Sequence, residues 1–108
     1  MILGIFRNRL REGAREAYAP VAVRMAELAQ AAPGFVSMKT FAADDGERVT
    51  VFTFDDLASV DAWRAHAEHR EAQRLGRTDF YTHYELVIAE VVRTSAFAAV
   101  AGSGQGGG

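Results

Sequence analysis

The tripeptide Asp44-Asp45-Gly46 lies between two short runs, 35–42 and 47–54, that are rich in β-branched and aromatic residues. An Asp-Gly step between two such runs predicts a β-hairpin, because these residues readily adopt turn conformations. The segments on either side of this hairpin therefore decide which fold the chain adopts.

The segments before the hairpin predict a strand and then a helix. Residues 1–11 begin apolar and become arginine-rich, which is typical of a strand with two different faces. Over 14–32 the apolar residues recur at steps of three and four, which indicates a helix. These residues are Tyr18, Val21, Met25, Leu28 and Ala32. Pro20 predicts that this helix kinks or begins late, and Pro33-Gly34 ends it.

The segments after the hairpin predict a second helix and a last strand. Asp55 or Asp56 is expected to cap the helix, because a carboxylate accepts hydrogen bonds from the free N–H groups of a first turn. Helical character continues to Leu75, with Gly76 as its stop, and 84–93 forms a mostly buried strand.

The predicted order is β-α-β-β-α-β, the ferredoxin-like α+β arrangement with a four-stranded antiparallel sheet and both helices on one face. The other face also carries apolar residues, so a second copy is expected to cover it and form a homodimer through the sheet faces, a dimeric α+β barrel. Residues 1–93 form this domain, and 94–108 form an Ala/Gly-rich tail that is expected to be partly flexible.

Composition excludes several classes of function. The chain of 108 residues has no cysteine, which excludes thiolate metal sites and a cysteine nucleophile. A net charge of −2 argues against nucleic acid as a partner. No apolar run reaches the roughly 20 residues of a membrane span, and the N-terminal charges follow the apolar residues, so we expect a cytoplasmic protein.

The stretch from Trp63 to Tyr84 holds the residues best suited to chemistry. On a continuous helix, one stripe runs through Trp63, His66, Arg70, Gln73 and Arg77. A stripe of this composition suits the wall of a cleft for an aromatic or anionic ligand. The simpler interpretation is a core tryptophan beside a solvated histidine pair, His66 and His69, with Tyr81 and Tyr84 as packing residues. No third ligand accompanies the histidines, so no metal site is predicted.

Asn8 is a polar residue on the predicted face of Ile2 and Phe6. If that face meets the helices, its amide needs a partner, which could be a ligand; if the strand frays, Asn8 only caps its end. The sequence has no GxGxxG motif after a strand, no phosphate loop and no GxSxG motif. An active site here would therefore be free of cofactors or would bind an aromatic cofactor such as haem.

Three places in the sequence resemble the antibiotic biosynthesis monooxygenase family of dimeric α+β barrels, over roughly 1–93. The first two are the segments FRNRL at 6–10 and APGF at 32–35. The third is a set of spaced residues, namely Trp63, His66, His69, Gln73, Gly76, Arg77, Phe80, Tyr81 and Tyr84. Ala67 stands where many members have proline, just before the Glu-His pair.

The resemblance implies that a phenolic, polycyclic or quinol-type aromatic substrate is oxidised by dioxygen without a cofactor. In that reading His66 or His69 is the base, while Arg77 and Asn8 stabilise the substrate anion. The substrate-binding residues would be Trp63, Gln73, Tyr81 and Tyr84.

Two alternatives stay open at the level of the sequence. Haem-degrading relatives have a first-strand asparagine, a tryptophan on the second helix and a histidine ligand further along it. Asn8 and Trp63 match the first two, but Gln73 stands where the histidine is expected. The other alternative is a non-catalytic dimer that binds a metabolite, since a fold does not fix a function.

Overall fold

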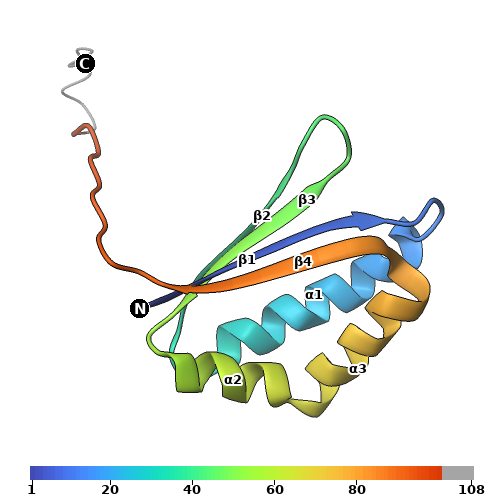
Figure 1. Ribbon diagram of the computed structural model, residues 1–108, viewed down its shortest axis with the longest axis horizontal. Coiled ribbons are helices and arrows are strands. Elements are labelled where there is room, and N and C mark those ends of the chain that lie inside the picture. Colours follow the sequence, from blue (N-terminus) through green and yellow to red (C-terminus); the bar gives the residue numbers. More distant parts are fainter. Residues whose placement is uncertain (101–108) are drawn as a thin grey trace.

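A computed structural model describes residues 1–100. The expectation of a flexible tail end concerns 101–108, which lie outside the described residues. The elements are β1 Ile2–Leu10, α1 Arg15–Ala31, β2 Phe35–Ala42, β3 Arg48–Phe54, α2 Leu57–Ala65, α3 Ala67–Leu75, the π-helical turn η1 Gly76–Phe80 and β4 Tyr81–Glu90. Residues 91–100 continue from β4 without forming a helix or strand and extend away from the body (Figure 1).

The four strands form one antiparallel sheet in the order β2-β3-β1-β4, and the helices cover one of its faces (Figure 1). This arrangement confirms the predicted ferredoxin-like fold. The hairpin of β2 and β3 lies where the Asp-Asp-Gly turn predicted it. The sheet has an inner face, which meets the helices, and an outer face on the opposite side.

The hydrophobic core fills the space between the inner face and the helices. Its buried members are Ile2, Ala29, Phe52, Phe54, Val60 and Trp63. Gly4 lies opposite Phe52 in the sheet, and a Cβ atom at position 4 would fall 2.0 Å from the Phe52 ring. Glycine at this position therefore leaves the space that the phenylalanine ring occupies.

The second predicted helix is in fact two helices, so the expectation of one continuous helix was wrong. The chain turns out of helical geometry at His66 (φ −57°, ψ 136°). His66 acts as the N-cap of α3, since its Nδ1 accepts a hydrogen bond from the backbone N–H of Glu68 at 3.2 Å. A side chain that satisfies a free N–H group stabilises a new helix start. The break separates the two halves of the predicted stripe.

The last strand begins at Tyr81, three residues earlier than predicted, and ends at Glu90. The π-helical turn η1 leads from α3 directly into this strand, where the sequence predicted only a stop at Gly76. At the other end of the domain, α1 begins at Arg15 and includes Pro20, so the late start is excluded.

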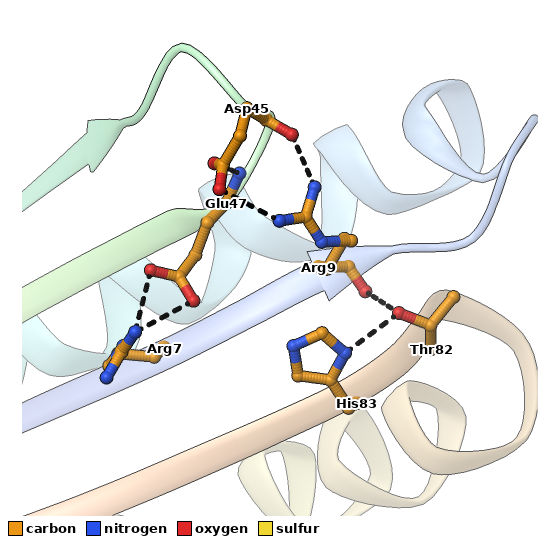
Figure 2. A network of polar contacts seen from close by, with 6 residues as sticks. All are labelled: Arg7, Arg9, Asp45, Glu47, Thr82 and His83. Carbon is orange, nitrogen blue, oxygen red and sulfur yellow. Dashed lines mark hydrogen bonds and ion pairs between the residues drawn. The ribbon is translucent and has the colours of Figure 1, made fainter.

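Polar contacts attach the turn of the β2–β3 hairpin to β1 (Figure 2). Arg7 donates to both carboxylate oxygens of Glu47 at 3.1 Å, and Arg9 pairs with Asp45 at 3.3 Å. The Thr82 hydroxyl donates to the carbonyl oxygen of Arg9 at 3.2 Å. The Thr82 bond joins β4 to β1, whereas the two exposed arginine pairs contribute up to ~1 kcal/mol each to holding the hairpin turn against β1.

The outer face of the sheet carries an apolar row across three strands. Ile5 in β1 pairs with Val51 in β3 and with Val87 in β4, and Val87 is 42% exposed. Phe41 in β2 is 51% exposed. Among residues 1–100, no helix has the length and apolarity needed to cross a membrane.

Candidate functional site

A cavity of about 230 Å³ lies between the inner face of the sheet and the helices. This volume is slightly below the ~300–1,000 Å³ that is usual for small-molecule sites. Aromatic side chains contribute much of the lining, and they are Phe6, Tyr18, Phe52, Trp63, Phe80, Tyr81 and Tyr84. A space of this size and composition suits a flat aromatic molecule of a few fused rings.

Strand alternation decides which sheet residues reach the cavity. In β3 the buried Phe52 and Phe54 face the helices, so Arg48 and Thr50 share that face. Side chains from β1 and β4 follow the same rule, and Phe6 lies opposite Leu86. The inner face of the sheet therefore forms one wall of the cavity, with apolar residues toward one end of that wall and Arg48 toward the other.

Trp63 and His69 form one part of the helical wall. Trp63 is 8% exposed, stacks on Phe54 at 5.3 Å between ring centroids, and lies 4.4 Å from the His69 ring. Trp63 Nε1 and His69 Nδ1 are both buried without a partner in the described part of the protein. Buried polar atoms without partners are unfavourable by ~1–3 kcal/mol each, which makes them good contacts for a ligand.

The surroundings of His69 favour its neutral form. Burial lowers its pKa from 6.5 to about 4, and the positive charge of Arg64 acts in the same direction. The backbone of Arg64 acts in the opposite direction and raises the pKa of His69, while the nearby His66 lowers that pKa further. At neutral pH His69 is therefore an uncharged imidazole in the cavity wall. One of its ring nitrogens is free of a proton but binds one more weakly than that of an ordinary histidine does, and a nearby anion would raise its affinity for a proton.

Tyrosine side chains gather where α1, η1 and β4 meet. The Tyr81 hydroxyl donates a hydrogen bond to the Tyr18 hydroxyl at 3.1 Å, and Phe6 lies 5.6 Å from the Tyr81 ring and 5.5 Å from the Tyr84 ring. Burial is the largest cause of a raised Tyr81 pKa, and Tyr18 adds to it. Tyr81 is therefore a neutral hydrogen-bonding group rather than a base.

The charged side chains that line the cavity are all positive. Arg48, Arg64 and Arg77 line it, and no aspartate or glutamate does. Within residues 1–100, none of these arginines has an ion-pair partner. The Nε atoms of Arg48 and Arg64 are also buried without a hydrogen-bond partner in that part of the chain. The cavity therefore favours an anion or a molecule that becomes one when it binds.

The structure places most, but not all, of the predicted site residues around this cavity. Those in the lining are Trp63, His69, Gln73, Arg77, Tyr81 and Tyr84. His66 is exposed and lies outside the lining, since the helix break turns it away as a cap. Asn8 is on the inner face and 1% exposed but is not among the lining residues, and its Oδ1 has no partner among the described residues.

Sequence reasoning missed Arg48, Arg64 and Tyr18 as cavity residues. A signal for Arg48 existed, because it stands an even number of positions before Phe52 and Phe54 in a predicted strand. No comparable signal identified Arg64, since its direction depends on where α2 ends. No group of three histidine, aspartate or glutamate residues suited to a metal ion occurs in the part of the chain described.

Comparison with known proteins places this geometry in a family. The family model described as antibiotic biosynthesis monooxygenase matches residues 1–75. The uncharacterized protein YqjZ of Bacillus subtilis (strain 168) is 35% identical over 80 residues, which cover 74% of this chain and 70% of that protein. The chain therefore belongs to the antibiotic biosynthesis monooxygenase family, and the predicted resemblance is confirmed.

Solved structures share the fold. A putative antibiotic biosynthesis monooxygenase from Deinococcus radiodurans aligns with a TM-score of 0.81 at 11% identity, covering 92% of this chain and all of its own. A variant of SnoaB, a cofactor-independent oxygenase from Streptomyces nogalater, aligns with a TM-score of 0.73 at 18% identity, covering 86% of this chain and 94% of its own. At these identities the likeness establishes the fold.

Proposed function

We propose that this protein is a small monooxygenase that oxidises a phenolic, polycyclic or quinol-type aromatic substrate with dioxygen and needs no resident cofactor. The observation that carries this proposal is the cavity itself. Aromatic rings, an uncharged His69 and three arginines line it, and no carboxylate does. The cofactor-independent oxygenase SnoaB shares the fold, which agrees with the proposal.

The first step is removal of the phenolic proton of the substrate. His69 accepts it at one of its ring nitrogens, and the resulting imidazolium lies beside the phenolate that it created. The positive charges of Arg48, Arg64 and Arg77 stabilise that phenolate, and the aromatic walls exclude water from it. The low pKa of His69 in the free protein means that this step depends on the stabilised anion.

The later steps balance without any outside reductant. The electron-rich phenolate gives one electron to dioxygen, and the two radicals combine to form a carbon–oxygen bond at a ring C–H carbon. The peroxide then takes up a proton and loses water as its O–O and C–H bonds break, leaving a ketone. In sum, a phenol and dioxygen give a quinone and water, and one oxygen atom enters the product.

Haem does not fit the cavity as the structure has it. A porphyrin is a macrocycle of four pyrrole rings, much larger than the few fused rings that about 230 Å³ can hold. His69 is the histidine in the lining that would have to hold the iron, but its ring lies 4.4 Å from that of Trp63, which leaves little room beside it. We derive no step through haem. A hemin titration without a saturable Soret band is the expected result.

We further propose that two copies associate through their outer sheet faces. The support is the apolar row of Val51, Ile5 and Val87, together with the exposed Phe41. Packing the two sheets face to face removes this surface from water, and a two-fold dimer does so with one interface.

Oxygen uptake tests the proposed activity. Purified protein treated with a chelator is mixed with a hydroxynaphthalene or an anthrone, and oxygen consumption is followed together with quinone formation. We expect one dioxygen consumed per quinone, and one labelled atom in the product when ¹⁸O₂ is supplied. The Trp63→Phe variant, which keeps an aromatic wall, is expected to fold and to oxidise the substrate more slowly.

Two results would contradict the proposal. Conversion that requires added reduced flavin or iron would show that the mechanism is not free of cofactors. Saturable binding of the aromatic compound with no oxygen consumption for any compound tried would instead identify a non-catalytic metabolite-binding protein.

A further inference from the structure

We propose that Arg48 forms a subsite for a carboxylate on the aromatic ligand, so that the preferred substrates are aromatic acids that also carry a phenolic hydroxyl. This inference rests on the proposed function in one respect, namely that the cavity is the ligand site. It concerns recognition, and its test does not require turnover.

Arg48 lacks the carboxylate partner that four arginines of this chain have, although Arg64 and Arg77 in the cavity lining lack one too. Arg7, Arg9, Arg24 and Arg74 each pair with an aspartate or glutamate within 3.3 Å. Arg48 has no such pair in the described part of the chain, and its Nε is buried without a hydrogen-bond acceptor. A buried guanidinium N–H without an acceptor is unfavourable, so the ligand is expected to supply the missing anion.

The position of Arg48 is fixed by the elements around it. Its guanidinium lies over the Tyr18 ring, 5.3 Å from the ring centroid, so α1 supports a side chain that comes from β3. Asn8 is its direct neighbour across the sheet, and the Asn8 Oδ1 accepts no hydrogen bond from it. The donors of Arg48 are therefore held in place and remain available to the cavity.

The other two arginines of the lining are less suited to this role. Arg64 also lines a second surface hollow together with Asp61, which places an acidic residue near it. Arg77 is exposed on the π-helical turn. Arg48 is the lining arginine that combines a strand position, a supporting ring and a buried free donor.

The chemistry of the guanidinium favours a carboxylate over a phenolate at this point. Its Nε and one Nη form a fork that matches the two oxygens of a carboxylate, and such paired hydrogen bonds are short and strong. A phenolate has one oxygen and uses the fork less well. With the carboxylate held at Arg48, the ring lies in the aromatic part of the cavity and its hydroxyl remains free to meet His69.

Binding of three matched naphthalenes tests this inference. Titration calorimetry compares 2-naphthoate, the uncharged 2-naphthamide and 2-naphthol against the wild type and against Arg48→Gln and Arg48→Lys. Arg7→Gln is the matched control, because it removes an arginine from the outer face of the neighbouring strand. Thermal melts establish that each variant is folded.

We expect the wild type to bind naphthoate more tightly than naphthamide. Arg48→Gln should weaken naphthoate binding about tenfold or more, because a hydrogen-bonded charge pair is lost, and should change naphthamide binding by less than about twofold. Arg48→Lys keeps the charge without the fork and should fall between these results. Arg7→Gln should bind like the wild type.

Equal binding of naphthoate and naphthamide by the wild type would overturn the inference, and so would an equal loss of both in Arg48→Gln. If Arg48→Gln loses naphthol binding while naphthoate binding is unaffected, the group that Arg48 binds is a phenolate and not a carboxylate. If Arg48→Gln does not fold, the wild-type preference and Arg48→Lys decide the matter. Failure of oxygen uptake with this binding pattern intact would reject the proposed oxidation and leave the subsite standing.

Discussion

His66 and His69 are three residues apart in the chain and have different surroundings. The break between α2 and α3 exposes His66, whose ring caps the following helix, while His69 lies in the cavity wall against Trp63. From the sequence alone, either histidine was the candidate base, and the periodic pattern did not distinguish them. A single capping contact therefore determines which imidazole can reach a ligand.

Substitution of the two histidines should separate their roles. His69→Asn should lower the rate of substrate oxidation about a hundredfold or more, the usual effect of removing a general base. His66→Asn keeps a good N-cap side chain and should stay within about twofold of the wild-type rate. Single-turnover oxygen consumption measures both, and equal losses in the two variants would contradict the assignment.

His69 should also make folding stability depend on pH. Its pKa is about 4 in the folded protein and 6.5 ordinarily, so between these values the unfolded chain binds a proton that the folded protein does not. Stability from this group is complete above pH 6.5 and is lost as the pH falls toward 4. Because the ring is partly exposed, we expect a loss on the order of 2 kcal/mol.

Urea unfolding of the wild type and His69→Asn between pH 7 and pH 5 checks this expectation. The variant should lose less stability over that interval, and NMR titration of the His69 ring should give the low pKa directly. A His69 midpoint near 6.5 in the folded protein would reject the burial argument.

At the scale of elements, α2 begins with an aspartate cap. Asp56 accepts a hydrogen bond from the backbone N–H of Ser59 at 2.8 Å, and this bond is the largest cause of the lowered Asp56 pKa. Since α2 carries Val60 and Trp63 into the core, the cap helps to hold one wall of the cavity.

Asp56→Ala should lower the free energy of unfolding by about 1 kcal/mol, the typical contribution of an N-cap. Asp55→Ala removes the same charge one residue earlier but no cap, so the difference between the two variants isolates the hydrogen bond. Urea denaturation at neutral pH measures it. Equal destabilisation by the two variants would attribute the effect to charge at the helix end instead.

The elements that the sequence predicted well are those defined by local chemistry. The turn at 44–46 and the helix end at Pro33-Gly34 follow from residues whose backbone preferences are strong. The break at His66 was not predictable in the same way, because the helical spacing from Trp63 to Gln73 continues through it and Ala67 gives no proline signal. Arg48 was overlooked because its role depends on Tyr18, 30 positions earlier.

For the whole molecule, the proposed dimer depends on the outer sheet face. Val51→Lys places a charge in the centre of the apolar row and should convert a dimer into monomers at micromolar concentration. Ala19→Lys, on the exposed side of α1, is the control and should leave the dimer intact. Light scattering coupled to size exclusion measures both. A wild-type protein that is already monomeric would contradict the proposed association.

Gly4 and Phe52 also constrain how this sequence can change over evolutionary time. Because a Cβ at position 4 would fall within 2.0 Å of the Phe52 ring, a mutation there is tolerated only if a smaller residue has first replaced the phenylalanine. That replacement alone would leave a hole in the core next to Trp63. The two positions should therefore vary together among relatives, and lineages that keep the large ring should keep the glycine.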